Sequence, residues 1–134
     1  MPAQQNIAFE TIVQSALYGN GEEDIAPGLY VINDPKEWEA LIEKMNRVNN
    51  ETKKFTSRHI DFNNNRIIGV FGKILGSGGV KLQIEKIEKR AGKIIVYARY
   101  ITPQGQLATQ IMNQPYHLVL IPKENEKFEL EILD

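Results

Sequence analysis

Three residue types found in catalytic triads alternate in one short stretch of the chain, as Ser57, His59 and Asp61. A serine nucleophile, a histidine base and an orienting carboxylate would hydrolyse an ester or amide bond if they formed a hydrogen-bonded relay. On one strand, however, same-face side chains two residues apart lie about 7 Å apart, which is too far for such a relay. Known triads also draw their members from separated segments. The spacing therefore favours polar surface residues, and we expect no catalytic residues in this chain.

Metal binding is also disfavoured by the residue types present. The only histidines are His59 and His117, and cysteine is absent, so a zinc site would need both histidines and distant carboxylates. The acidic triplet Glu22, Glu23 and Asp24 lacks the alternating oxygen ligands and the closing glutamate of an EF-hand loop. We therefore expect a solvated loop at residues 22–24, and neither a metal nor a cofactor.

A glycine-rich run, Gly76, Ser77, Gly78 and Gly79, invites comparison with phosphate-binding loops. It lacks the lysine and Ser/Thr ending of a P-loop, and it precedes a predicted strand instead of a helix. Glycine adopts positive φ without steric cost, so the run predicts a tight turn or a bulge. Because loops on a rigid scaffold commonly carry function, these four residues are our first candidates for contact with a partner.

Composition narrows the class of partner. The 134 residues carry 16 basic and 17 acidic side chains, a net charge of -1, with 42% apolar and 25% charged residues. Such values are ordinary for one globular domain, which we place over residues 1–134. A chain without a strong field of either sign is a poor nucleic-acid or anionic-membrane binder, so we expect a protein partner and no nucleic acid. No apolar run approaches the roughly 18 residues of a membrane span.

The clearest local signal predicts one main helix over residues 35–47. Asp34 suits the N-cap, Pro35 the first turn, and Glu37 lies three residues after the cap. Apolar residues then recur with helical spacing, which makes one stripe that must pack on something. These residues are Trp38, Leu41, Ile42 and Met45. We expect Trp38 to anchor the helix on a sheet.

Alternating or continuous apolar runs predict the strands. The expected strands cover residues 7–13, 29–32, 67–71, from 80 onward, 94–101, 116–121 and 128–132. Short turns between several of them predict an antiparallel meander in the second half, with residues 102–114 as a long connection. The fold class is therefore α+β: a mostly antiparallel twisted sheet of about six or seven strands with one helix packed on it.

Polar segments are expected at the surface. Residues 1–6 should form a flexible N-terminal arm. Residues 49–65 should cross the surface, with Phe55, Ile60 and Phe62 tucked under as a small cluster. Glu85 and Glu88 should lie outward as part of a solvated charged edge.

Two motifs resemble the C-terminal domain of PrcB, an accessory subunit of a protease complex. Ser77-Gly78-Gly79-Val80 leads into an alternating strand, and the run PYHLVLIPK over residues 115–123 closes the domain. The resemblance also takes in the capped helix and extends from Leu29 to the end of the chain. The family's usual run is Pro-Thr-Gly-Gly-Tyr; here Gly76, Ser77 and Val80 replace its proline, threonine and tyrosine. The glycine pair therefore carries over, and any role of that tyrosine does not.

The resemblance implies a non-catalytic, extracytoplasmic domain, often lipid-anchored, that binds partner proteins, among them a protease. We accordingly expect a periplasmic or cell-envelope location, with membrane attachment only through a lipid anchor outside this chain. Tyr116 and His117 would flank the contact surface made by the glycine turn and residues 102–114, with a core position equally open for Tyr116.

Two other functions stay open. The Gly-Gly turn is similar to the inhibitory loop of chagasin-type cysteine-protease inhibitors, which implies a protease inhibitor acting through Gly76–Gly79; the Arg-Pro-Trp loop of that family is missing here. A small hydrolase using His59 or His117 is the remaining alternative.

Overall fold

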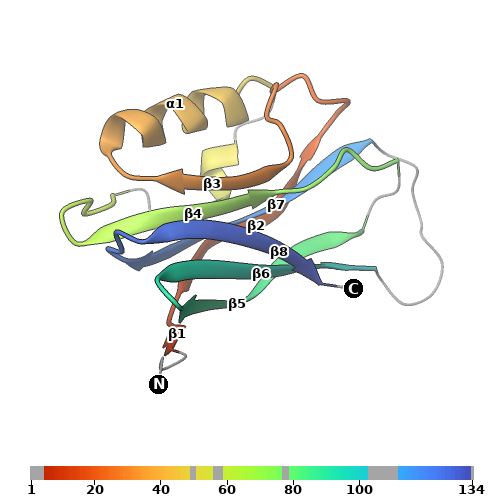
Figure 1. Cartoon of the computed structure of the whole chain (residues 1–134). Coiled ribbons are helices and arrows are strands. Elements are labelled where there is room, and N and C mark those ends of the chain that lie inside the picture. The colour runs from red at the N-terminus through yellow and green to blue at the C-terminus, as the bar shows by residue number, and fades with distance from the viewer. Residues whose placement is uncertain (1–4, 49–50, 56–58, 77–78, 103–111, 134) are drawn as a thin grey trace.

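The structure, a computed structural model, describes residues 5–48, 51–55, 59–76, 79–102 and 112–133. Figure 1 shows a helix above two stacked sheets. We call the four-stranded sheet with strand order β2-β7-β4-β3 the central sheet, because it lies between the helix and the other sheet. The second sheet, β1-β5-β6-β8, is the outer sheet.

The elements follow one another from β1 to β8. Their bounds are β1 Gln5–Ile7, β2 Glu10–Tyr18, β3 Gly28–Ile32, α1 Pro35–Met45, the 3-10 turn η1 Glu51–Lys54, β4 Asn65–Phe71, β5 Lys81–Arg90, β6 Lys93–Ile101, β7 Asn113–Pro122 and β8 Lys127–Leu133.

The helix begins as its sequence predicts. The Asp34 carboxylate accepts a hydrogen bond from the Glu37 N–H at 2.8 Å, and the Glu37 carboxylate accepts one from the Asn33 N–H at 2.7 Å. The first bond satisfies a backbone donor that the first turn leaves without a helical partner, and the second ties the residue before the N-cap to the helix. In the described part of the chain, no helix is long and apolar enough to cross a membrane.

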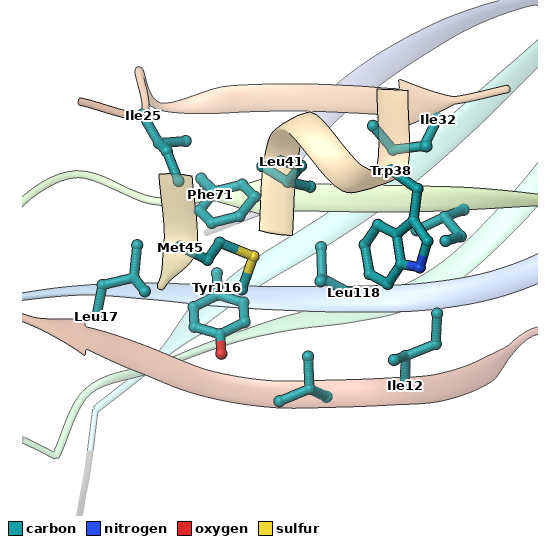
Figure 2. Close-up of a cluster of buried hydrophobic side chains, with 12 residues drawn as sticks. Ile12, Leu17, Ile25, Ile32, Trp38, Leu41, Met45, Phe71, Tyr116 and Leu118 are labelled. Atoms are coloured by element: carbon teal, nitrogen blue, oxygen red, sulfur yellow. The ribbon is translucent and has the colours of Figure 1, made fainter. Parts of the chain in front are cut away.

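The apolar stripe of α1 packs on one face of the central sheet (Figure 2). Trp38 is 4% exposed and stacks on Phe55 with ring centroids 5.5 Å apart, which confirms its expected role as an anchor. Met45 is fully buried near Phe71 and Tyr116, whose rings stack at 5.2 Å. Phe55, Ile60 and Phe62 pack against the same core, as expected.

The opposite face of the central sheet packs on the outer sheet. Alternation along β4 sends Ile67 and Phe71 toward the helix, and Ile68 and Val70 toward the outer sheet. The second core is completed by buried residues of β5, β6 and β7: Leu82, Ile84, Ile87, Ile94, Val96, Ala98, Val119 and Ile121. Because β4 and β7 are covered on both faces, their sequences are nearly continuous apolar runs.

The expectation of a single sheet of six or seven strands is wrong, because eight strands form two sheets. Only Ala8 and Phe9 separate β1, in the outer sheet, from β2, in the central sheet, so the chain changes sheets there. The segment after β4 makes the same passage to β5, and these two strands do not pair with each other. The α+β class and the largely antiparallel pairing are confirmed.

The predicted meander holds only for the β5–β6 hairpin. β7 pairs with β2 and β4 in the central sheet, and β8 returns to pair parallel with β6. The chain therefore leaves the outer sheet after β6 and comes back one strand later. Alternation predicts a strand and its wet face but does not reveal which of two stacked sheets it joins.

The N-terminal arm is shorter than expected. Gln5 and Asn6 belong to β1 and lie opposite Lys89 and Glu88 of β5. Residues 1–4 lie outside the described part of the chain. The first strand also runs further than residues 7–13, because β2 extends to Tyr18 through a register shift between Thr11 and Val13.

Replacing the N-cap, Asp34→Ala, should lower the free energy of unfolding by about 1 kcal/mol, because the Glu37 N–H loses its acceptor. Urea unfolding measures this change. The matched control Glu39→Ala, at an exposed position of α1, should change stability by less than about 0.5 kcal/mol. Equal effects of the two substitutions would contradict the capping role.

Candidate partner-binding surface

Three segments meet at the end of the molecule where β2 and β4 end and β7 begins (Figure 1). The Gly19 N–H donates to the Met112 carbonyl at 2.8 Å. Leu75 and Asn113 exchange two backbone hydrogen bonds, at 2.7 and 2.9 Å. The segment after β4 thus continues to run beside the start of β7, and the loop after β2 closes on its other side.

Exposed apolar side chains gather on these segments. Of the large hydrophobic side chains that are exposed in the described residues, three lie here: Tyr18 at 50%, Ile74 at 40% and Met112 at 40%. We call these three residues, with Gly19 and Gly76 between them, the loop-end surface. A single exposed apolar residue needs no explanation, but several at neighbouring positions are typical of a contact surface.

Glycines fix the shape of this surface. At Gly21, where φ is +83°, an added Cβ would lie 2.6 Å from the Ile74 side chain. At Gly19, where φ is +130°, it would meet the Glu22 carboxylate, which itself accepts from the Asn20 N–H at 2.7 Å. Only glycine combines positive φ with such close approach. The loop after β2 therefore packs closely against the Ile74 side chain, in the segment after β4.

The predicted glycine turn lies at the rim of this surface. Gly76 is exposed, and a Cβ there would come within 3.8 Å of the Met112 sulfur. Gly79 is exposed with φ of +91°, as a turn requires. Ser77 and Gly78 lie outside the described residues, as does most of the connection 102–114, whose last two residues belong to β7.

A cavity of about 170 Å³ borders the loop-end surface. One wall is the outer edge of β2, and the other is the chain entering β5. The lining residues are Gln14, Ser15, Ala16, Tyr18, Gly79, Val80, Lys81 and Asn113. A side chain of a partner bound over Tyr18 could enter this space.

Tyr116 does not flank this surface as expected, because it is fully buried. Its hydroxyl donates to the Glu51 carboxylate at 2.7 Å, beneath the C-terminal end of α1. Burial, together with this bond, raises the pKa of Tyr116 above its ordinary value. Even-numbered residues of β7 point toward the helix, and the PYHLVLIPK motif alone does not predict that direction.

His117 is also buried, at 3% exposure, between the two sheets. The Ile84 N–H donates to its Nδ1 at 2.9 Å, so the proton of the neutral ring resides on Nε2, 2.9 Å from the Thr11 hydroxyl. Burial lowers the pKa of His117 to about 4. The ring thereby joins β7 to the buried Ile84 N–H of β5, and it cannot touch a partner in this arrangement.

Three glutamates that looked solvated are buried: Glu23, Glu51 and Glu88. Glu88 forms ion pairs with Lys86 at 3.3 Å and Arg90 at 2.8 Å. A bulge between Ile84 and Lys86 changes the alternation of β5, so the expected outward position is wrong. Sequence spacing alone does not reveal that bulge.

The expectation that Glu22, Glu23 and Asp24 are all solvated is wrong for Glu23, which is buried. Burial raises its pKa, and nearby Glu22 and Glu51 raise it further. Glu51 is held by Tyr116 and by Lys54, whose ammonium lies 3.2 Å from both carboxylate oxygens. Lys54 is close to Glu51 in sequence, but Tyr116 is 65 residues away, so the local sequence does not predict the burial of Glu51.

The structure describes two of the three alternating residues Ser57, His59 and Asp61. Ser57 lies outside the described residues, and His59 is exposed. The Asp61 carboxylate accepts from the Asn63 N–H at 3.0 Å and from the Asn64 side-chain amide at 2.7 Å, which closes the turn before β4. Among the described residues, no three His, Asp or Glu side chains come together to hold a metal ion.

Comparison with known proteins gives one match. The family model described as PrcB C-terminal matches residues 75–122, from the segment after β4 through β5 and β6 to the end of β7. No curated protein and no solved structure matches the chain. The family resemblance drawn from the glycine pair and the run after Pro115 is therefore confirmed over this segment.

Removing the hydroxyl of the buried tyrosine, Tyr116→Phe, should lower the free energy of unfolding by about 1.5–3 kcal/mol, because buried Glu51 loses a charge-assisted donor. Chemical denaturation measures the loss. Tyr30→Phe is the matched control, since its hydroxyl donates to the Ala26 carbonyl at an exposed position, and it should cost less than about 1 kcal/mol. An unchanged free energy of unfolding in Tyr116→Phe would show that the bond between Tyr116 and Glu51 contributes nothing to stability.

Stability should fall as the pH drops from about 6.5 to about 4, because of His117. The unfolded ring titrates near 6.5 and the folded ring near 4, so the unfolded state binds more protons in this window. Within this window the free energy of unfolding should fall by up to about 1.4 kcal/mol for each pH unit. Unfolding curves at several pH values should show a smaller slope for His117→Gln than for the unmodified chain, whereas His59→Gln, at an exposed site, should keep the full slope. Identical slopes for both variants would contradict a neutral buried ring.

Proposed function

Residues 75–122 of this chain match the PrcB C-terminal family, and from that premise we propose that the chain is a non-catalytic protein-binding module, accessory to a protease complex outside the cytoplasm. The matched segment contains Gly76 and Met112, two residues of the loop-end surface. The proposal assigns partner contact to that surface. The family's association with protease complexes supports the identity of the partner.

The observation that carries the proposal is the exposure of three large apolar side chains, Tyr18, Ile74 and Met112, on segments that backbone hydrogen bonds join. Aromatic residues and methionine are enriched where proteins meet. The glycines at 19 and 21 allow the loop the positive φ and the close approach to Ile74 and Glu22 that its shape requires. An exposed apolar surface of this kind supports binding better than it supports turnover.

Charge supports the same reading. The net charge of -1 gives no long-range steering, so association should depend on apolar contact more than on ionic strength. The ammonium of Lys54 lies 5.7 Å from the centre of the Tyr18 ring, and the Glu22 carboxylate lies against Gly19. Lys54 holds the ring by a cation–π interaction and extends the flat face of the patch.

Introducing a charge into the loop-end surface should weaken partner binding at least tenfold, because a carboxylate would be desolvated against apolar groups. The substitutions are Tyr18→Asp, Ile74→Asp and Met112→Asp. Each tagged variant is recovered from the cell-envelope fraction of its own organism, and the co-purifying proteins are quantified by mass spectrometry. Val48→Asp is the matched control, because Val48 is 46% exposed and belongs to none of the three segments of this surface.

A protease subunit that co-purifies with the unmodified chain and with Val48→Asp, but not with the three variants, is the expected result. Equal recovery with all variants would contradict the assignment of the surface. Adding the purified chain to that protease then separates support from inhibition: the proposal predicts maintained or increased turnover, whereas stoichiometric inhibition would indicate an inhibitor.

A further inference from the structure

Strand β3 is an open edge of the central sheet. In the part of the chain that the structure describes, β3 pairs with β4 alone, from Gly28 opposite Phe71 to Ile32 opposite Ile67. Alternate residues of such an edge strand direct their N–H and C=O groups away from the sheet. Four of its five residues are partly exposed, in contrast to the buried β4 beside it. The edge is therefore open to a further strand.

An apolar cavity lies on each side of this edge. The helix-side cavity, of about 170 Å³, lies between β3 and α1 and is lined by Ile25, Tyr30, Ile32, Ala40, Leu41 and Lys44. The sheet-side cavity, of about 320 Å³, lies between the start of β3 and the outer sheet and is lined by Pro27, Gly28, Phe71, Lys73, Tyr100, Leu130 and Ile132. Figure 1 shows α1 above β3 and β8 below it in that view.

The two cavities match the alternation of a strand. Along β3, Tyr30 and Ile32 pack on the helix side, and Leu29 and Val31 pack toward the outer sheet. The side chains of a strand added to this edge would alternate in the same way. Consecutive residues of that strand could therefore place one apolar side chain in each cavity.

Each cavity also carries one lysine: Lys44 on the helix side and Lys73 on the sheet side. In the described part of the chain, no carboxylate lies within ion-pair distance of either ammonium group. A cation at the rim of an apolar cavity favours an acidic group on the molecule that fills it.

From the free edge, the paired cavities and the two lysines, we propose that β3 binds an extended segment of a partner protein by strand addition, and that this segment carries adjacent apolar residues flanked by aspartate or glutamate. Main-chain hydrogen bonds provide affinity in this mode, and side-chain pockets provide specificity. A second copy of this chain fits less well, because residues 28–32 contain no acidic residue to meet Lys44 and Lys73. None of these residues belongs to the loop-end surface, so the inference does not depend on the proposed function.

Selection of a random octapeptide phage library on the immobilised full chain tests the proposal. The enriched peptides should contain adjacent apolar residues beside Asp or Glu, with no proline at their centre. The strongest is then synthesised with a fluorescent label, and its affinity is measured by anisotropy. Amide NMR spectra should place the largest shifts on residues 29–32.

Substitutions at the cavity rims should weaken the peptide at least tenfold. Ala40→Arg fills the helix-side cavity from an exposed helix position, and the pair Lys44→Glu with Lys73→Glu reverses both charges. Lys36→Glu, also exposed on α1 but outside both cavities, and Tyr18→Asp, on the loop-end surface, should change affinity less than twofold. Circular dichroism confirms that each variant is folded.

The proposal is overturned if no acidic and apolar peptide is enriched, if the peptide binds Ala40→Arg as well as the unmodified chain, or if the amide shifts fall on β2 or β8 instead. Shifts on residues 29–32 that grow with protein concentration in the absence of peptide would show that the occupant is a second copy. Loss of peptide binding in Tyr18→Asp would mean that the peptide contacts the loop-end surface.

Discussion

Burial of the central sheet on both faces is the constraint on which the rest of the structure depends. β4 and β7 receive α1 on one side and the outer sheet on the other, so the two hydrophobic cores share the same two strands. A side chain that changes face in β4 or β7 would leave one core and enter the other. Phe71, Tyr116 and Trp38 fix the helix side, and Ile68 and Val119 fix the sheet side.

This arrangement sends chemistry-bearing side chains inward and leaves the loop end to present apolar groups. His117 accepts from the Ile84 N–H, and the Gln14 side-chain amide donates to the Leu82 carbonyl. Both bonds join the central sheet to the backbone of β5. Tyr116 is used to hold a buried carboxylate. The residues exposed at the loop end, Tyr18, Ile74 and Met112, offer mainly apolar contact area, which is why partner binding is the function that we propose.

The sequence predicted the elements well, and their partners less well. The capped helix, the tryptophan anchor and the doubly buried run at residues 67–71 depend on spacing within a few residues, and spacing is local information. The two sheets, the parallel return of β8 and the burial of Glu88 depend on a bulge and on long-range pairing, which alternation does not encode. For the same reason Gly76 and Gly79 were found from the sequence, because they belong to one short glycine-rich run. Tyr18, Ile74 and Met112 were not found, because single apolar residues in separate segments form no pattern.

Hydrogen–deuterium exchange of the chain, free and bound to the protease partner that we propose, tests the central claim most directly. The account predicts slower exchange on binding at residues 18–19, 74–76 and 112–113, which contain the loop-end surface, with α1 and the exposed face of the outer sheet unchanged. Protection confined to α1 or to the outer sheet, with the loop end exchanging as before, would contradict it.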